Sequence, residues 1–245
     1  SFNVIAMDCR FHGFTTGGER KSHTLENSAE CVMALLDALD LPSYSLYCEG
    51  VHGANVGAWI ATKRPEKVTA LLLASPGFMK EAPHVVELLK SVQQELLINK
   101  PGHGGDDTGT FPPEANDQIA AYFIGSSPRV KAQREEMTVR FQKRYGTGHS
   151  AHDVGYLFSC VYNRQPIPVD LLAKITCPVM VIRGGDDAIV CPEEACNAWR
   201  RAFVNAKGGA QEFVVSGAPS LISLSDSNVL NRVIMQFVQR ATAGK

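Results

Sequence analysis

Four side chains of this 245-residue chain are of types that do acid–base or nucleophilic chemistry, and each follows a separate apolar run. They are His52, Ser75, Asp187 and Ser220. A histidine, a carboxylate and a bound water can supply general-base catalysis, which accelerates reactions by about 10²–10⁴-fold. Asp187 and His52 are the pair in this chain that fits such chemistry, and both serines lack an obvious basic partner. No histidine follows His152, so none is near Ser220 in sequence.

The elements that must position these residues are predicted from hydrophobic periodicity. Five runs are apolar throughout rather than alternating, and helical segments with apolar spacing stand between them. This pattern is typical of a parallel sheet covered by helices on both faces, an α/β fold. The predicted strands lie within residues 2–8, 44–48, 69–77, 177–187 and 211–217. The predicted helices lie within 24–41, 54–65, 192–203 and 225–241, with Thr24 as the N-cap of the first.

The strand pattern is missing between residues 78 and 165. Amphipathic segments over 84–97 and 127–145 are separated by a loop rich in glycine, proline and aspartate, residues 99–114. We therefore predict a helical cap over 78–165, inserted into a core made of residues 1–77 and 166–245. The glycines of 102–109 lack a GKS or GKT ending and follow no strand, which argues against a phosphate-binding loop.

Composition limits the partners and the compartment. The 24 basic and 25 acidic residues give a net charge of -1, without the basic stripe that nucleic-acid binding requires. The seven cysteines are an odd number, with no CxxC pair and no Cys/His spacing typical of zinc, so we predict free thiols, no metal and no cofactor. No apolar run approaches the ~20 residues of a membrane span, and no signal peptide is visible. These features favour a soluble cytoplasmic protein that contacts neither membrane nor nucleic acid.

Five segments in order carry a family resemblance. They are VIAMDCRFHGFT, SLYCEGVHGANVGAWIATKRPEKV, ALLLASPG, ITCPVMVIRGGDDAIV and VVSGAPSLISLSDSNVLNRVIMQFV. Together they resemble the fourth strand, the nucleophile elbow, the sixth strand, the acid-bearing strand and the histidine loop of the α/β-hydrolase superfamily. The resemblance implies an α/β-hydrolase fold with a cap. It also implies a serine on a strained strand-to-helix turn, a histidine base and an orienting carboxylate.

The triad positions implied by this resemblance are degenerate. Counting back from the Pro65-Glu-Lys-Val68 end of the elbow helix places the nucleophile at Val51, between Gly50 and Gly53. The acid position falls on Asp187 and the histidine position on Ser220. Valine has no nucleophilic atom, and a serine hydroxyl is no general base near neutral pH. The serine-free elbow is similar to that of the NDRG-type pseudo-hydrolases, which some short segments of this chain also resemble faintly.

The resemblance further implies a third strand between the fourth and fifth strands of the sheet, carrying a His-Gly oxyanion turn. That strand would precede residue 2, so we expect the sequence to continue upstream. His12 and Gly13 suit the fourth strand's turn instead.

Two functions follow. One is a non-hydrolytic protein whose pocket residues Gly50, Val51, His52, Ser75, Asp187 and Ser220 bind a small apolar molecule or a protein partner. The alternative is a hydrolase of ester, lactone or C–C bonds, or a cofactor-free lyase, that uses non-standard residues. Asp187 also has a structural alternative to ligand binding, in which it caps its own turn or pairs with Arg183.

Overall fold

A computed structural model describes residues 2–13, 15, 23–83, 85–87, 89–91, 120–121, 124–125, 128–145 and 151–243, with side chains omitted for 141–145 and 151–156. Its sheet has four parallel strands in the order β1-β2-β3-β4. They are β1 (Tyr44–Glu49), β2 (Val68–Ala74), β3 (Val179–Gly184) and β4 (Gln211–Val215). Because all four run parallel, their carboxyl ends lie at one edge of the sheet, where ligand sites of such sheets form.

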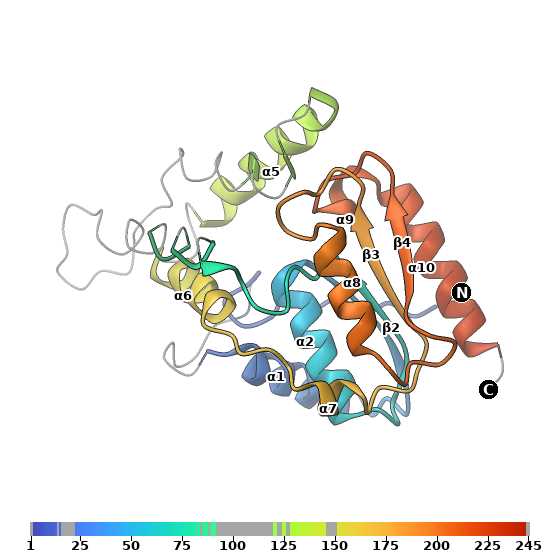
Figure 1. The fold of residues 1–245 in the computed structure, drawn as a ribbon. Helices are drawn as coiled ribbons and strands as arrows, with labels where there is room; N and C mark the ends of the chain where they lie inside the picture. The colour runs from blue at the N-terminus through green and yellow to red at the C-terminus, as the bar shows by residue number, and fades with distance from the viewer. Residues whose placement is uncertain are drawn as a thin grey trace.

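Helices cover both faces of the sheet, as the apolar strands predicted. α2 (Gly50–Lys63), α8 (Glu193–Ala202) and α10 (Ser227–Thr242) pack on the strands, and α1 (Leu25–Ala38) packs on α2. Figure 1 shows α2 and α8 on one face and α10 on the other. Along β2, Leu71 and Leu73 join the core under α1, α2 and α8, whereas Leu72 joins the core under α10. This alternation is the two-residue period of a strand, here buried on both sides.

The capping prediction for α1 is confirmed. Thr24 has an extended backbone, and its hydroxyl accepts a 3.0 Å hydrogen bond from the amide of Asn27. This bond satisfies one of the amides that the first turn of a helix leaves without a partner. The N-cap of α1 is therefore Thr24, the residue that the sequence predicted.

The predicted strand over residues 2–8 is wrong. This segment has no strand conformation, and Val4 and Ile5 are 85% and 50% exposed. A strand needs a hydrogen-bonded neighbour. The expected sheet order put a further strand between this segment and β1, and no described residue occupies that place. The apolar sequence of 2–8 alone therefore does not form sheet.

The segment predicted as a cap contributes helices apart from the sheet. They are the 3₁₀ turn η2 (Pro128–Val130), α5 (Lys131–Tyr145) and α6 (Ala151–Tyr162), and α7 (Val169–Leu172) follows them. Figure 1 places α5 and α6 to one side of the sheet. The loop 99–114 and most of the predicted helix 84–97 lie outside the described residues. The boundary of a cap at 78–165 stays a prediction.

Two arginines of this insertion, residues 78–165, form ion pairs: Arg129 pairs with a residue of the core, and Arg164 joins the two ends of the insertion. Arg129 Nη2 lies 2.6 Å from a carboxylate oxygen of Asp226, and Arg129 also donates to the carbonyl of Gly217. Arg164 Nη2 lies 2.9 Å from Glu81 Oε1, with the two side chains only 3% and 7% exposed. The first contact is at the surface and the second is buried, so they differ in electrostatic strength.

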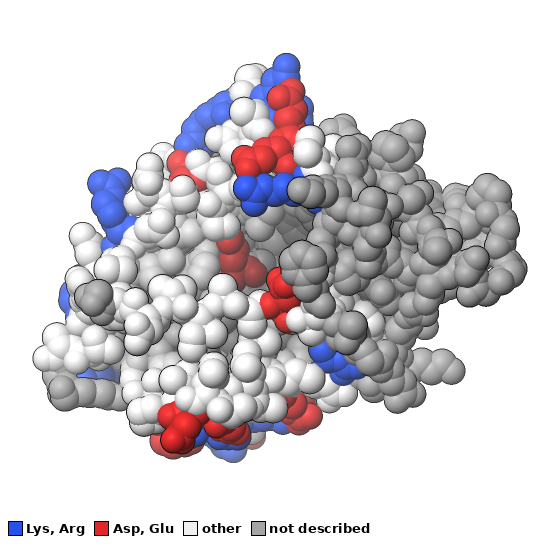
Figure 2. All heavy atoms as spheres, turned by 180° about the vertical axis from the view of Figure 1, so that it is seen from behind, with Lys and Arg blue, Asp and Glu red and all other residues white. Residues whose placement is uncertain are grey.

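The surface charges of the insertion are mixed in sign. Figure 2 shows red and blue spheres side by side over α5 at the top of the view. Lys131 pairs with Glu135 and Arg140 with Glu136, each four residues apart on one side of the helix. Exposed i,i+4 pairs of this kind stabilise a helix by a few tenths of a kcal/mol each. Within the described part of the chain, no helix is both long and apolar enough to cross a membrane.

Candidate functional site

The strand-to-helix turn after β1 is an elbow whose left-handed residue is Gly50. β1 ends at Glu49, α2 begins at Gly50, and Gly50 has φ +74°. A side-chain carbon added at Gly50 would meet no described atom within 4 Å. Val51, the predicted nucleophile position, already lies in the first turn of α2 and is not among the positive-φ residues. The left-handed position of this elbow is therefore Gly50, one residue before Val51, the nucleophile position that the resemblance implies.

Val51 packs inward rather than into open space. A carbon added at Gly77 would lie 2.7 Å from Val51 Cγ2 and 3.5 Å from the carbonyl of Val190. Gly77, which has φ +72°, thus lies between the elbow and the turn after β3. The assignment of the nucleophile position to Val51 came from counting back from Pro65, and it stays a prediction. On either register, glycine or valine, the elbow supplies no nucleophilic atom.

The carboxylate of Asp187 accepts hydrogen bonds from backbone amides of the turn after β3. One carboxylate oxygen accepts hydrogen bonds from the amides of Val190 (2.9 Å) and Ile189 (3.4 Å), and the other accepts from Cys191 (3.0 Å). The side chain is buried, and this desolvation raises the pKa of the carboxyl above its usual value, although the three amides partly offset the shift. Both oxygens are thus already hydrogen-bonded within the turn, which matches the structural role weighed for Asp187.

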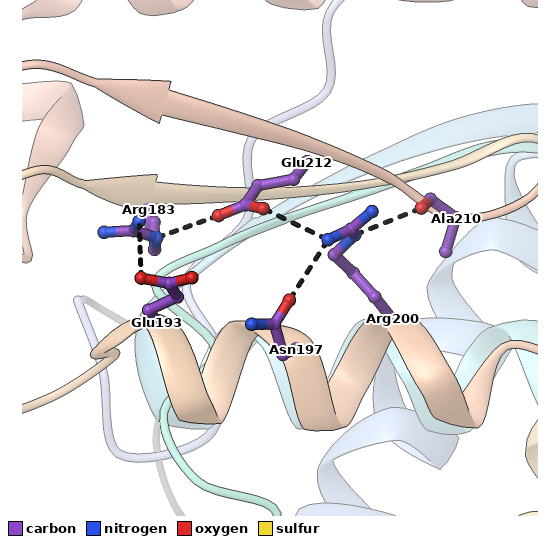
Figure 3. A network of polar contacts seen from close by, with 6 residues as sticks. All are labelled: Arg183, Glu193, Asn197, Arg200, Ala210 and Glu212. Carbon is purple, nitrogen blue, oxygen red and sulfur yellow. Dashed lines mark hydrogen bonds and ion pairs between the residues drawn. The ribbon is translucent and has the colours of Figure 1, made fainter.

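Arg183 is not the hydrogen-bonding partner of Asp187. Its Nε lies 2.9 Å from Glu212 of β4, and its Nη2 lies 3.9 Å from Glu193 of α8. Arg200 lies 3.1 Å from the second oxygen of Glu212, as Figure 3 shows. This network joins β3, β4 and α8 and leaves Asp187 to the backbone amides of its own turn.

The loop after β4 places Ser220 against the end of β2. Ser75 has φ +45°, which is rare for a residue with a side chain, and its hydroxyl donates a 2.7 Å hydrogen bond to the carbonyl of Ser220. The Ser220 hydroxyl is buried and has no hydrogen-bond partner among the described residues. Next to it, the amide of Ser223 donates to Glu49 Oε1 at 2.9 Å. The ends of β1, β2 and β4 therefore meet here through these two bonds.

The predicted site residues are brought together in part. Gly77 joins the elbow to the Asp187 turn, and the Ser75 and Glu49 bonds join the Ser220 loop to the same edge of the sheet. His52 is the exception. Among the described residues, no hydrogen bond or ion pair joins it to Asp187, although the sequence predicts the two as a candidate general-base pair.

His52 belongs to a histidine cluster that the sequence did not reveal. Its ring centroid lies 4.6 Å from that of His12 and 6.0 Å from that of His23, and Phe11 packs edge-on against His23 at 4.8 Å. His23 is 5% exposed, and neither of its ring nitrogens has a hydrogen-bond partner within the described structure. Burial lowers the pKa of His23 to about 4 and that of His52 well below its usual value. Both rings are therefore neutral at physiological pH.

This neutral burial predicts acid sensitivity. Unfolded His23 takes up a proton near pH 6.5, whereas folded His23 does so only near pH 4. Between these values the unfolded state binds more protons, so the free energy of unfolding should fall as pH drops, by about 2 kcal/mol from His23 alone. Urea unfolding in the presence of a chelator, at several pH values from about 7 to 4, measures the effect. In His23→Leu the fall should be smaller; equal slopes for the two proteins would contradict the prediction.

Known proteins resemble this chain in structure rather than in sequence. No family model matches the sequence, and no curated protein matches it either. Among solved structures, the chain is similar to an esterase from Thermogutta terrifontis, with 18% identity over 96% of this chain and 78% of that one and a TM-score of 0.73. It is also similar to MGS-M2, an α/β-hydrolase enzyme from a Medee basin deep-sea metagenome library (14% identity, 94% and 77% covered, TM-score 0.71).

A third similar structure is the enol-lactonase from Burkholderia xenovorans, with 13% identity, 95% and 79% of the two chains covered, and a TM-score of 0.70. At identities this low the likeness is one of fold. The parallel sheet, the elbow that begins α2 and the order of the strands agree with that likeness. The fold expected from the five sequence segments is thereby confirmed, and this chain has the α/β-hydrolase fold.

Proposed function

We propose that this protein does not hydrolyse substrates through a nucleophile elbow, but uses the α/β-hydrolase fold to bind a small apolar molecule or a protein partner. The observation that carries the proposal is the elbow itself. Gly50 takes the left-handed position and faces open space, and Val51 behind it packs against Gly77. Acyl transfer needs an atom that attacks the substrate at this point, and here there is none.

The other two triad positions support the same function. Both oxygens of Asp187 accept hydrogen bonds from backbone amides, and the family resemblance assigns the histidine position to Ser220, whose hydroxyl is no base. Without a nucleophile or base, no negative charge develops at this edge of the sheet for the protein to stabilise. A floor of glycine, valine and a neutral histidine ring suits an apolar ligand better than a charged transition state.

The alternative is a hydrolase of ester, lactone or C–C bonds, or a cofactor-free lyase, that works through Asp187, His52 and a water. It is less well supported, because His52 contacts His12 and His23 instead of Asp187. A water between the two would have to replace a direct contact, and the acceleration would stay near the about 10²–10⁴ of a lone general base.

The test introduces a serine at one of the two candidate elbow positions, Gly50 or Val51, together with a histidine at Ser220. We expect Gly50→Ser/Ser220→His to react with a fluorophosphonate probe and to gain activity on a short aryl ester, because a serine at Gly50 projects into open space. Val51→Ser/Ser220→His should stay unreactive, since a side chain at 51 faces Gly77. The matched control Gly50→Ala/Ser220→His carries the same strained φ, which costs about 1–3 kcal/mol, but no hydroxyl.

Probe labelling and ligand screening of the unmodified protein test the proposal directly. No serine of it should be labelled, and a thermal-shift screen with small apolar molecules should raise the melting temperature for some of them. Specific labelling of one serine in the unmodified protein, or turnover that Asp187→Asn abolishes while the fold is kept, would instead establish the enzyme alternative. A screen without any shift would leave the protein partner as the occupant to be sought.

A further inference from the structure

Three metal-ligating side chains come together where the insertion meets the elbow. His23 precedes the N-cap of α1, His52 lies in the first turn of α2, and Cys160 lies near the end of α6. One ligand atom from each lies within 4.8 Å of the other two. The three residues are 29 and 108 positions apart in the chain, so no local motif joins them.

These donors are buried and mostly without partners. His23 and Cys160 are each 5% exposed. Neither nitrogen of His23 nor Nε2 of His52 has a hydrogen-bond partner among the described residues. A buried polar atom left without a partner costs about 1–3 kcal/mol, and native structures seldom leave three together. An ion that accepts one lone pair from each ring would remove this cost for one nitrogen of His23 and for Nε2 of His52.

We propose that His23, His52 and Cys160 form a binding site for a divalent zinc ion. Two imidazoles and a thiol are the donor types that zinc prefers over magnesium and calcium, which prefer oxygen ligands. A tetrahedral ion with Zn–N near 2.0–2.1 Å and Zn–S near 2.3 Å sets its ligand atoms about 3.3–3.6 Å apart. The cluster reaches this geometry when the most separated pair closes by roughly 1 Å, within the reach of side-chain rotation.

Binding of the ion releases one proton from the protein. The Cys160 thiol donates a hydrogen bond to the carbonyl of Leu157 at 3.0 Å. When the ion binds, the S–H bond breaks, its proton goes to solvent and the thiolate sulfur bonds to zinc. The two neutral rings contribute lone pairs without losing a proton. Three protein ligands leave a fourth tetrahedral position for a water.

The site would fix the insertion to the elbow. Its ligands come from the start of α1, the start of α2 and the end of α6, so a bound ion connects the insertion to the turn that carries Gly50. This inference does not depend on the proposed function, because it concerns the binding of an ion and not the absence of hydrolysis.

Metal binding by the full chain tests the inference. After removal of metal with a chelator, we expect one Zn²⁺ or Co²⁺ to bind per chain, and Co²⁺ to give the charge-transfer absorption of a thiolate ligand. Cys160→Ser should abolish that absorption. Because loss of a residue behind a metal ligand already costs 10–100-fold in affinity, loss of a ligand itself in Cys160→Ser or His52→Gln should cost at least about 100-fold.

Cys31→Ser is the matched control, because Cys31 is an exposed cysteine of α1 and is not one of the three proposed ligands. It should bind metal like the unmodified protein. Chelator should also lower the melting temperature of the unmodified protein and of Cys31→Ser, but not of Cys160→Ser or His52→Gln. Binding of equal affinity in Cys160→Ser, or no metal bound at micromolar concentration by the folded unmodified chain, would overturn the site.

Discussion

Replacing Arg164 with methionine should lower the free energy of unfolding by about 3–5 kcal/mol. The guanidinium is 3% exposed, lies 2.9 Å from the carboxylate of Glu81 and also donates to the carbonyls of Phe78 and Val161. Removing it leaves the buried Glu81 charge without a counter-ion, and an uncompensated charge of this kind is strongly destabilising. Urea unfolding followed by circular dichroism gives the difference.

The matched control removes both charges. In Arg164→Met/Glu81→Leu no buried charge is left, and replacement of a buried ion pair by apolar side chains is often neutral or even stabilising. We therefore expect the double variant to recover most of the stability that the single variant loses. A single variant as stable as the unmodified protein would mean that Glu81 and Arg164 are solvated rather than paired.

Trp199→Ala should destabilise the protein by about 3–5 kcal/mol as well. The indole is 0% exposed, stacks on Phe203 with 5.9 Å between ring centroids and donates from Nε1 to the carbonyl of Gly77 at 2.9 Å. Truncation leaves a cavity, which adds to the lost transfer free energy of the ring. It also frees the carbonyl of the residue against which Val51 packs.

Trp199→Phe separates the two contributions. Phenylalanine keeps most of the ring volume but cannot donate to Gly77, so we expect a loss of about 1–3 kcal/mol for the unsatisfied carbonyl and the smaller ring. Denaturant unfolding of the three proteins side by side measures both steps. Equal stability of the alanine and phenylalanine variants would show that the hydrogen bond, and not the packing, carries the effect.

The sequence predicted the elements whose information is local. Apolar runs over β2 and β3 are buried on both faces, as continuous apolar strands in a parallel sheet must be. Thr24 caps α1 through its own side chain, so the start of that helix could be read from the chain. The order of strands and helices then limited the fold to very few arrangements.

Properties that depend on distant residues could not be predicted in this way. Residues 2–8 have the composition of a strand, but a strand exists only with a neighbour. The left-handed conformation of Gly50 could not be predicted either, because its φ depends on the three-dimensional path from β1 to α2. The histidine cluster was missed because the fold, and not the spacing, brings residues 23 and 52 to Cys160.

The two arginine ion pairs of the insertion respond differently to dissolved salt. Arg129 is 48% exposed beside Asp226, so counter-ions in the solvent screen this pair, with a Debye length of about 8 Å at physiological ionic strength. The Arg164–Glu81 pair is buried, and such ions hardly reach it. Raising the ionic strength therefore weakens the contact of the insertion with Asp226 and leaves in place the pair that joins the two ends of the insertion.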